Sequence, residues 1–110
     1  MTSASDHEAL VTAVKQAALE APALTPTQLR QGVALRAAGG PTIGAPYDTL
    51  AKQIGDAAYR VTDAQVASVL AAAGSEKAAF EIIAAAAVGA GLQRWDIGAK
   101  VVQEAIDAAQ

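Results

Sequence analysis

Very few residues of this chain could carry out chemistry. The sequence has no cysteine and one histidine, so residue counts alone exclude zinc fingers, iron–sulfur ligation and cysteine nucleophiles. The one imidazole, His7, stands between Asp6 and Glu8 near the amino terminus. It could act as a general base or as one ligand of a metal, but a side chain at such a position is more typically solvated. We therefore predict no metal site and no cofactor.

Glu81 and Arg94 are the two candidates for a catalytic role, because each interrupts an otherwise apolar segment. A charge placed there is costly unless it is paired or reaches solvent. On one helix these two residues would be about 20 Å apart along the axis and roughly 220° apart around it, so they could not pair with each other. We expect each to find a partner elsewhere in the fold, in another subunit or in a ligand, and a contact that fixes packing is the more typical outcome.

The sequence offers no site for phosphate or nucleic acid. Residues 39–44 are glycine-rich, but they lack the Gly-Lys-Ser/Thr ending of a phosphate-binding loop, and no strand precedes them. The net charge is -3 and the eight Lys and Arg are scattered, so no basic stripe could follow a phosphate backbone. We expect solvated helix faces at the following basic residues: Lys15, Arg30, Arg36, Lys52 and Arg60.

Five segments that would position these residues show helical capping signals and apolar residues at three- and four-residue spacing. They begin at Ser5, Thr25, Pro46, Thr62 and Ser75. The first should end near Glu20, and the fourth should end at Gly74 in a left-handed conformation. The last should continue to near the C-terminus. Residues 39–46, which contain several glycines and prolines, should form an ordered loop or hinge.

No segment alternates as a strand would, so we predict an all-α fold, a small helical bundle with a long C-terminal helix. A chain of 110 residues has the usual size of one domain. Within it, residues 1–45 would hold the N-terminal helices and the Gly/Pro loop. Residues 46–110 would form the main helical core.

The composition favours self-association through helix packing. The hydrophobic fraction is 53%, but only 4% of residues are aromatic and alanine is the most frequent residue, so each side chain removes little apolar area from water. Burial against other chains would compensate, although a monomeric alanine-rich bundle is an alternative. Gly89 and Gly91 lie inside the last predicted helix, where glycine costs about 1 kcal/mol relative to alanine. We expect them to allow close contact between subunits.

We predict no membrane insertion and a cytoplasmic location. The longest apolar run, residues 82–92, is far shorter than the roughly 20 residues that span a bilayer. The first eight residues show no basic region before an apolar stretch, so they do not resemble a secretory signal.

Several short motifs in the second half of the chain have the spacing of a known family. They are Val61-Thr62-Asp63, Ala73-Gly74, Phe80-Glu81 and Gly91-Leu92-Gln93-Arg94. Through them, residues 46–110 resemble the C-terminal half of carboxymuconolactone decarboxylase-like proteins, the superfamily that includes the alkyl hydroperoxidase D-like peroxidases. The resemblance implies an all-α bundle that assembles through its long helices into trimers or larger rings.

The resemblance transfers no catalytic residue. Redox members use a Glu upstream of a Cys-x-x-Cys-x-x-x-His segment, and residues 1–46, where that segment would lie, contain no cysteine and only His7. We therefore predict a non-catalytic helical protein that acts as an oligomeric assembly or accessory subunit and could hold a small apolar molecule between its helices. The alternatives are a thiol-independent decarboxylase or isomerase, with Glu81 and Arg94 as candidates near Trp95, and a partner subunit of a cysteine-bearing peroxidase-like chain.

Thiol-dependent peroxidase turnover is predicted to be absent. The chain has no cysteine, and the Met1 thioether cannot replace a thiolate in the attack on a hydroperoxide. Consumption of an organic hydroperoxide in metal-free buffer with a thiol reductant should therefore match that of the buffer alone. Steady turnover above this background would contradict the prediction.

Overall fold

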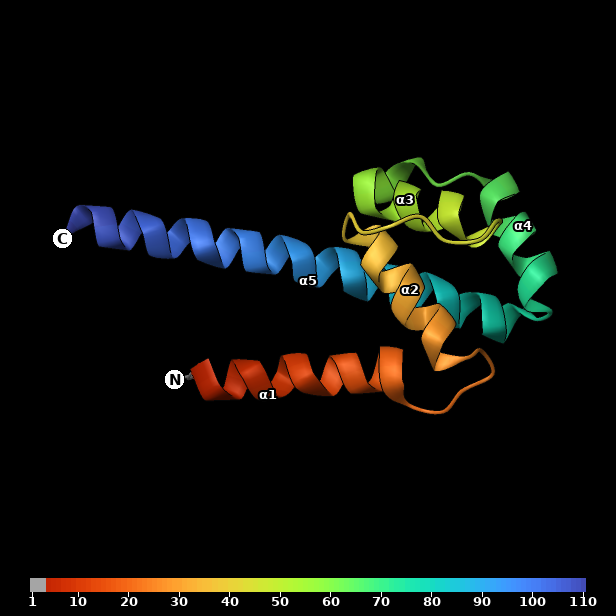
Figure 1. The fold of residues 1–110 in the computed structure, drawn as a ribbon, viewed down its shortest axis with the longest axis horizontal. Coiled ribbons are helices and arrows are strands. Elements are labelled where there is room, and N and C mark those ends of the chain that lie inside the picture. Colours follow the sequence, from red (N-terminus) through yellow and green to blue (C-terminus); the bar gives the residue numbers. More distant parts are fainter. Residues whose placement is uncertain (1–3) are drawn as a thin grey trace.

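The computed structural model describes residues 4–110, with side chains from residue 6 onward. The described residues form five α-helices and two short helical segments, without any strand (Figure 1). The elements are α1 (Ala4–Lys15), the π-helical segment η1 (Gln16–Glu20), α2 (Thr27–Ala37), α3 (Tyr47–Ala57), the 3₁₀ turn η2 (Ala58–Arg60), α4 (Asp63–Ala73) and α5 (Glu76–Ala109). The predicted all-α fold with a long C-terminal helix is confirmed.

The long helix α5 gives the molecule its elongated shape, with extents of 54 × 27 × 22 Å. Its first half packs against α2, α3 and α4, while its second half extends beyond them, and α1 lies along one side (Figure 1). Ser75 caps the start of α5, because its hydroxyl accepts a hydrogen bond from the backbone N–H of Ala78 at 3.1 Å. The helix therefore begins after the predicted capping residue and runs to Ala109, as expected.

The boundaries of α4 also follow the predicted signals. The Thr62 hydroxyl accepts a hydrogen bond from the backbone N–H of Gln65 at 3.1 Å, and the Gln65 side chain accepts one from the backbone N–H of Thr62 at 3.0 Å. These reciprocal bonds form the capping box that the sequence predicts. At the other end, Gly74 adopts a φ of 94°, the left-handed conformation that ends many helices.

The beginnings of α1 and α2 differ from the prediction. α1 is already helical at Ala4, so Ser5 lies within it, and the Ser5 side chain is outside the described part. α2 begins at Thr27, and no side chain caps it. Thr25, the predicted cap, instead donates its hydroxyl hydrogen to the carboxylate of Glu81 at 2.7 Å. As a cap, this hydroxyl would accept a hydrogen bond from an N–H group of α2; here it donates to an ionised carboxylate, which makes a stronger bond than a neutral acceptor would.

One apolar core joins α2, α3, α4 and α5, and thus both predicted parts of the chain. Its buried residues are Val33, Ala37, Leu50, Ala51, Ile54, Val69, Ala79, Ile82, Ala85, Ala86 and Ala90. More than half of them are alanines. Because protein interiors are close-packed, such short side chains fill the core only when the helix backbones approach closely.

Two glycines allow this close approach around α2. A Cβ added to Gly89 on α5 would overlap the backbone of Ala34, and one added to Gly55 on α3 would overlap the backbone of Ala37. The expected close backbone contact at Gly89 is therefore confirmed, but its predicted place between subunits is wrong, because its neighbour is α2 of the same chain. At Gly91 an added Cβ would meet no atom within 4 Å.

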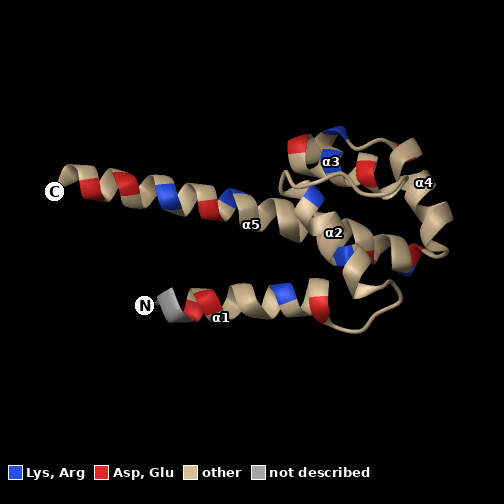
Figure 2. Cartoon of the chain, viewed as in Figure 1, with Lys and Arg blue, Asp and Glu red and all other residues tan. Residues whose placement is uncertain are grey.

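Beyond its start, where Arg94 contacts Gly55 and Trp95 contacts His7, the second half of α5 extends away from α2, α3 and α4 (Figure 1). We call residues 93–109 the C-terminal arm, and every residue of it is exposed. Figure 2 shows acidic and basic residues at intervals along the arm. Among the elements of residues 4–110, none has an apolar helical stretch sufficient to cross a membrane.

Replacing Gly89 by alanine should destabilise the protein, because the new methyl group overlaps the Ala34 backbone and overpacking typically costs about 1–3 kcal/mol. Gly91→Ala is the matched control on the same helix. Its methyl group would enter open space and remove the cost of an interior glycine, so stability should stay equal or rise by up to about 1 kcal/mol. Urea unfolding followed by circular dichroism measures both free energies. Equal effects of the two substitutions would contradict the close contact.

Candidate functional site

Glu81 binds the connection between η1 and α2. Its carboxylate accepts hydrogen bonds from the backbone N–H groups of Leu24 at 3.1 Å and Thr25 at 2.8 Å, in addition to the bond from the Thr25 hydroxyl. Backbone N–H groups just before a helix otherwise lack a partner within the chain. The side chain of Glu81 thus fixes the path by which the chain enters α2.

The same contacts keep Glu81 ionised. The hydrogen bond from the Thr25 hydroxyl, followed by that from the Thr25 backbone, lowers the pKa of the Glu81 carboxyl below its usual value. The Leu24 N–H and the charge of Arg30 act in the same direction, while desolvation opposes them. A general acid needs a raised pKa near the working pH. The arrangement therefore favours an anchoring carboxylate over a proton donor.

Arg30 binds the end of η1 and the start of the same connection, and its burial corrects the prediction that it is solvated. It is only 1% exposed. Its guanidinium donates hydrogen bonds to the carbonyl oxygens of Ala18, at 2.8 Å, and Ala21, and Gln31 donates to that of Leu19 at 3.3 Å. Carbonyls at the end of a helix are unpaired and carry partial negative charge, so they are suitable partners for a buried cation.

Arg94 lies at another place in the fold. Its guanidinium donates a hydrogen bond of 2.7 Å to the carbonyl oxygen of Gly55, near the end of α3, where a cation is electrostatically favoured. The structure therefore does not bring Glu81 and Arg94 together, because Glu81 binds the segment before α2. The prediction that each finds its own partner elsewhere in the fold is confirmed, and both partners are backbone groups or a hydroxyl.

His7 packs against Trp95 and is half-buried, so the prediction of a solvated side chain is wrong. The two ring centroids are 4.4 Å apart and the ring planes are tilted by 32°. The flat imidazole covers part of the indole, which reduces the apolar area that Trp95 exposes. Its Nε2 atom is buried and has no hydrogen-bond partner among the described residues. Within residues 4–110, no group of three or more acidic, His or Cys side chains could hold a metal ion.

Arg36 and Asp48 form a further charged contact that holds the loop between α2 and α3. Arg36 Nε and Asp48 Oδ1 are 2.8 Å apart, and Asp48 also accepts a hydrogen bond from the backbone N–H of Ile43 at 3.0 Å. The bond from Ile43, followed by that from Arg36, lowers the pKa of the Asp48 carboxyl. Because Arg36 is held in this ion pair, the prediction that it is solvated is wrong. The same bonds support the prediction of an ordered loop.

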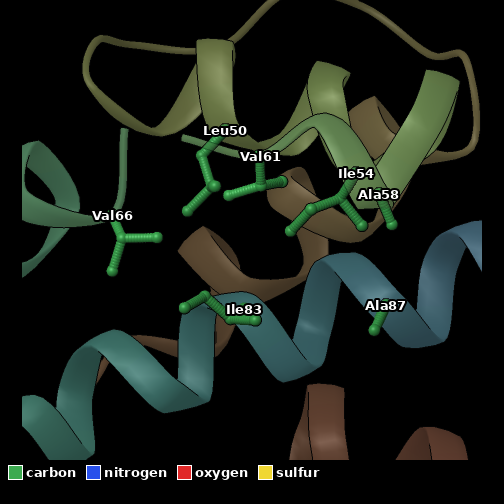
Figure 3. Close-up of a pocket in the computed structure, with 7 residues that line it drawn as sticks. All are labelled: Leu50, Ile54, Ala58, Val61, Val66, Ile83 and Ala87. Carbon is green, nitrogen blue, oxygen red and sulfur yellow. The ribbon is translucent and has the colours of Figure 1, made fainter. Parts of the chain in front are cut away.

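An apolar cavity of about 260 Å³ lies between α3, α4 and α5 (Figure 3). Its lining residues are Leu50, Ile54, Ala58, Val61, Val66, Ile83 and Ala87. Their side chains consist of carbon alone, so none can donate or accept a hydrogen bond or transfer a proton. Neither Glu81 nor Arg94 lines this cavity. It could accept an apolar group but provides no means of chemistry on it.

Comparison with known proteins gave no match to a protein-family model, to a curated protein or to a solved structure. The resemblance to carboxymuconolactone decarboxylase-like proteins therefore stays a prediction from the sequence motifs.

Glu81→Gln should lower stability at neutral pH, because the neutral amide would point its own N–H group at a backbone donor. The pKa of Glu81 is lowered by folding, so its stabilising effect is fully present above the ordinary pKa, near 4.5. The effect is lost as the pH falls through the lower pKa of the folded state. The difference in stability between wild type and variant should therefore shrink in acid.

Thermal unfolding of both proteins across the neutral and acidic range measures this difference. Asp56→Asn is the control, because its partner Lys52 is exposed and exposed ion pairs contribute little. A Glu81→Gln effect that is absent at neutral pH, or that does not change with pH, would contradict the anchoring role.

Proposed function

We propose that this chain is a non-catalytic helical protein that acts as an oligomeric assembly or accessory subunit and associates through its C-terminal arm. The observation that carries the proposal is the apolar surface of the arm. Five large apolar side chains of the arm are each about half exposed: Trp95 (54%), Ile97 (54%), Val101 (57%), Val102 (59%) and Ile106 (47%). Apolar side chains gathered on one exposed element are typical of an interaction surface.

The polar residues of the arm lie mainly on one side, with Arg94 as the exception. Asp96, Lys100, Gln103 and Asp107 follow one another at spacings of four, three and four residues, so they form one stripe along the helix. The rest of the circumference is mainly apolar. A shallow groove of about 440 Å³ on the apolar side is lined by Arg94, Trp95, Gly98, Ala99, Val102 and Gln103. This is the pattern of a helix that packs against another helix.

The polar stripe favours a protein partner over a lipid surface. Acidic residues outnumber basic ones in the stripe, where Lys100 is accompanied by Asp96 and Asp107, and Glu104 lies beside them. Helices that lie on membranes usually carry Lys and Arg on their polar side. The arm therefore suits a protein surface with a similar apolar face.

The charged residues support a structural function rather than catalysis. Glu81 is engaged by three donors of the loop before α2, and Arg94 is engaged by the end of α3. None of the side chains that line the apolar cavity could act as an acid, a base or a hydrogen-bond partner. The decarboxylase or isomerase alternative thus gains no support from the geometry.

Wild-type protein is expected to sediment as an oligomer, and Val102→Asp should sediment as a folded monomer. The substitution would place a carboxylate in the apolar contact, where an unpaired charge is strongly unfavourable. Gln103→Asp is the matched control, because it adds the same group one residue later, on the polar stripe. Sedimentation velocity over a range of concentrations measures all three. A folded wild-type monomer of 11.0 kDa at every concentration would refute self-association.

A further inference from the structure

We infer that two copies of this chain pair through their arms in antiparallel orientation, with Val102 of one copy facing Val102 of the other. The inference rests on the self-association proposed above and specifies its geometry. It is drawn from the order of large and small residues on the apolar side of the arm.

The apolar side of the arm contains a row with the spacing of paired helices. The row consists of Trp95, Ala99, Val102, Ile106 and Ala109, at intervals of four, three, four and three residues. This alternation gives a period of 3.5, which keeps one side of a helix against a partner along its whole length. The row extends for about 21 Å at 1.5 Å per residue, and Gly98 and Ala105 lie directly beside it.

The order of side-chain sizes along this row suits an antiparallel partner. In antiparallel pairing about Val102, Trp95 faces Ala109. At the next level, Ile106 faces Gly98. A large side chain therefore meets a small one at both levels, as close packing requires. Parallel pairing in register would instead place Trp95 against Trp95 and leave the levels of Gly98 and Ala109 unfilled.

The position of the two-fold axis follows from the same comparison. Moving the antiparallel pair by one heptad toward the body of the protein would place Trp95 opposite Val102, so two large side chains would compete for one level. Sliding the second arm by one heptad in the other direction would shorten the overlap. Trp95 would then contact no residue of the second copy. Pairing about Val102 also places Ala99 beside Ile106 of the other copy, on the same flank of the contact, so a further small side chain meets a large one.

Gly98 fits the same arrangement. It lies inside α5, where glycine destabilises a helix relative to alanine, yet a Cβ at this position would meet no atom within 4 Å. Gly89 has a close neighbour in its own chain, namely Ala34, and Gly98 has none. Ile106 of a second copy would supply the close neighbour that the single chain lacks.

A second copy is the occupant that the arm itself specifies. The partner has to present an apolar helical face of the same length and spacing, since the apolar row contains no charged residue. An identical arm does so by two-fold symmetry, because the same patch then serves both copies. The arm extends beyond α2, α3 and α4 (Figure 1). α1 lies beside the start of the arm, where His7 contacts Trp95 (Figure 1). The second arm would therefore contact the part of Trp95 that stays exposed, which is 54%, with the packed helices of the two copies at opposite ends of the pair.

Single cysteines test this arrangement cleanly, because the natural chain has none. Val102→Cys places the thiol at the two-fold axis, so mild oxidation of the full-length protein should convert most of it to a disulfide-linked dimer. Ala99→Cys alone should not cross-link, because its two copies would be about 9 Å apart along the axis, beyond disulfide reach. Lys100→Cys, on the polar stripe, is the control for random collisions and should stay monomeric on a denaturing gel.

A mixture of two variants tests the direction of the helices. Ala99→Cys and Ile106→Cys, one of them carrying a larger tag, should form a mixed disulfide dimer and little of either self-linked dimer, because these positions of the two copies lie on the same flank at nearly the same level. Self-linking of both Ala99→Cys and Val102→Cys without the mixed product would show parallel pairing and overturn the inference. An oligomeric wild type whose Val102→Cys variant does not cross-link would overturn it as well, while the proposed function would stand. A monomeric wild type would defeat both.

Discussion

The close approach of α2 to α5 and α3 is the constraint on which the rest of this structure depends. A core composed mainly of alanines fills its volume only when backbones nearly touch, and Gly89 and Gly55 make that possible against Ala34 and Ala37. Once α2 is held there, its side chains reach the end of η1, and the loop that follows it can be tied to α3. The end of η1 and the loop between α2 and α3 are thus held through one helix.

Charged side chains connect segments of the chain that the short alanine side chains do not reach. Arg30 takes up carbonyl groups at the end of η1, Glu81 takes up N–H groups before α2, and Arg94 takes up a carbonyl at the end of α3. Each of these contacts pairs a formal charge with backbone groups that helix ends leave open. Glu81 and Arg94, the two candidates for a catalytic role, and the buried Arg30 thus hold helix ends in a protein with little apolar area per residue.

Local signals in the sequence predicted most of the helices, and long-range contacts account for what it did not predict. The caps at Thr62 and Ser75 depend on residues three positions away, so they could be read directly. The contact of Thr25 with Glu81 joins residues 56 positions apart, and no local pattern encodes it. The burial of Arg30 was missed for the same reason. Glu81 itself was identified because a charge inside an apolar segment is costly, although its partner could not be named.

The two halves of α5 use different sides of one helix. A single row of residues at alternating spacings of four and three, from Ile82 through Gly89 to Asp96 and Asp107, is buried in the first half and becomes the polar stripe in the second. The apolar row that contains Val102 lies roughly on the other side. Because α5 has no break, the number of residues between these regions sets the azimuth at which a partner attaches. One residue inserted near Leu92 would turn the arm by about 100° around the helix axis relative to the core. The direction from which a partner approaches the core would turn by the same angle.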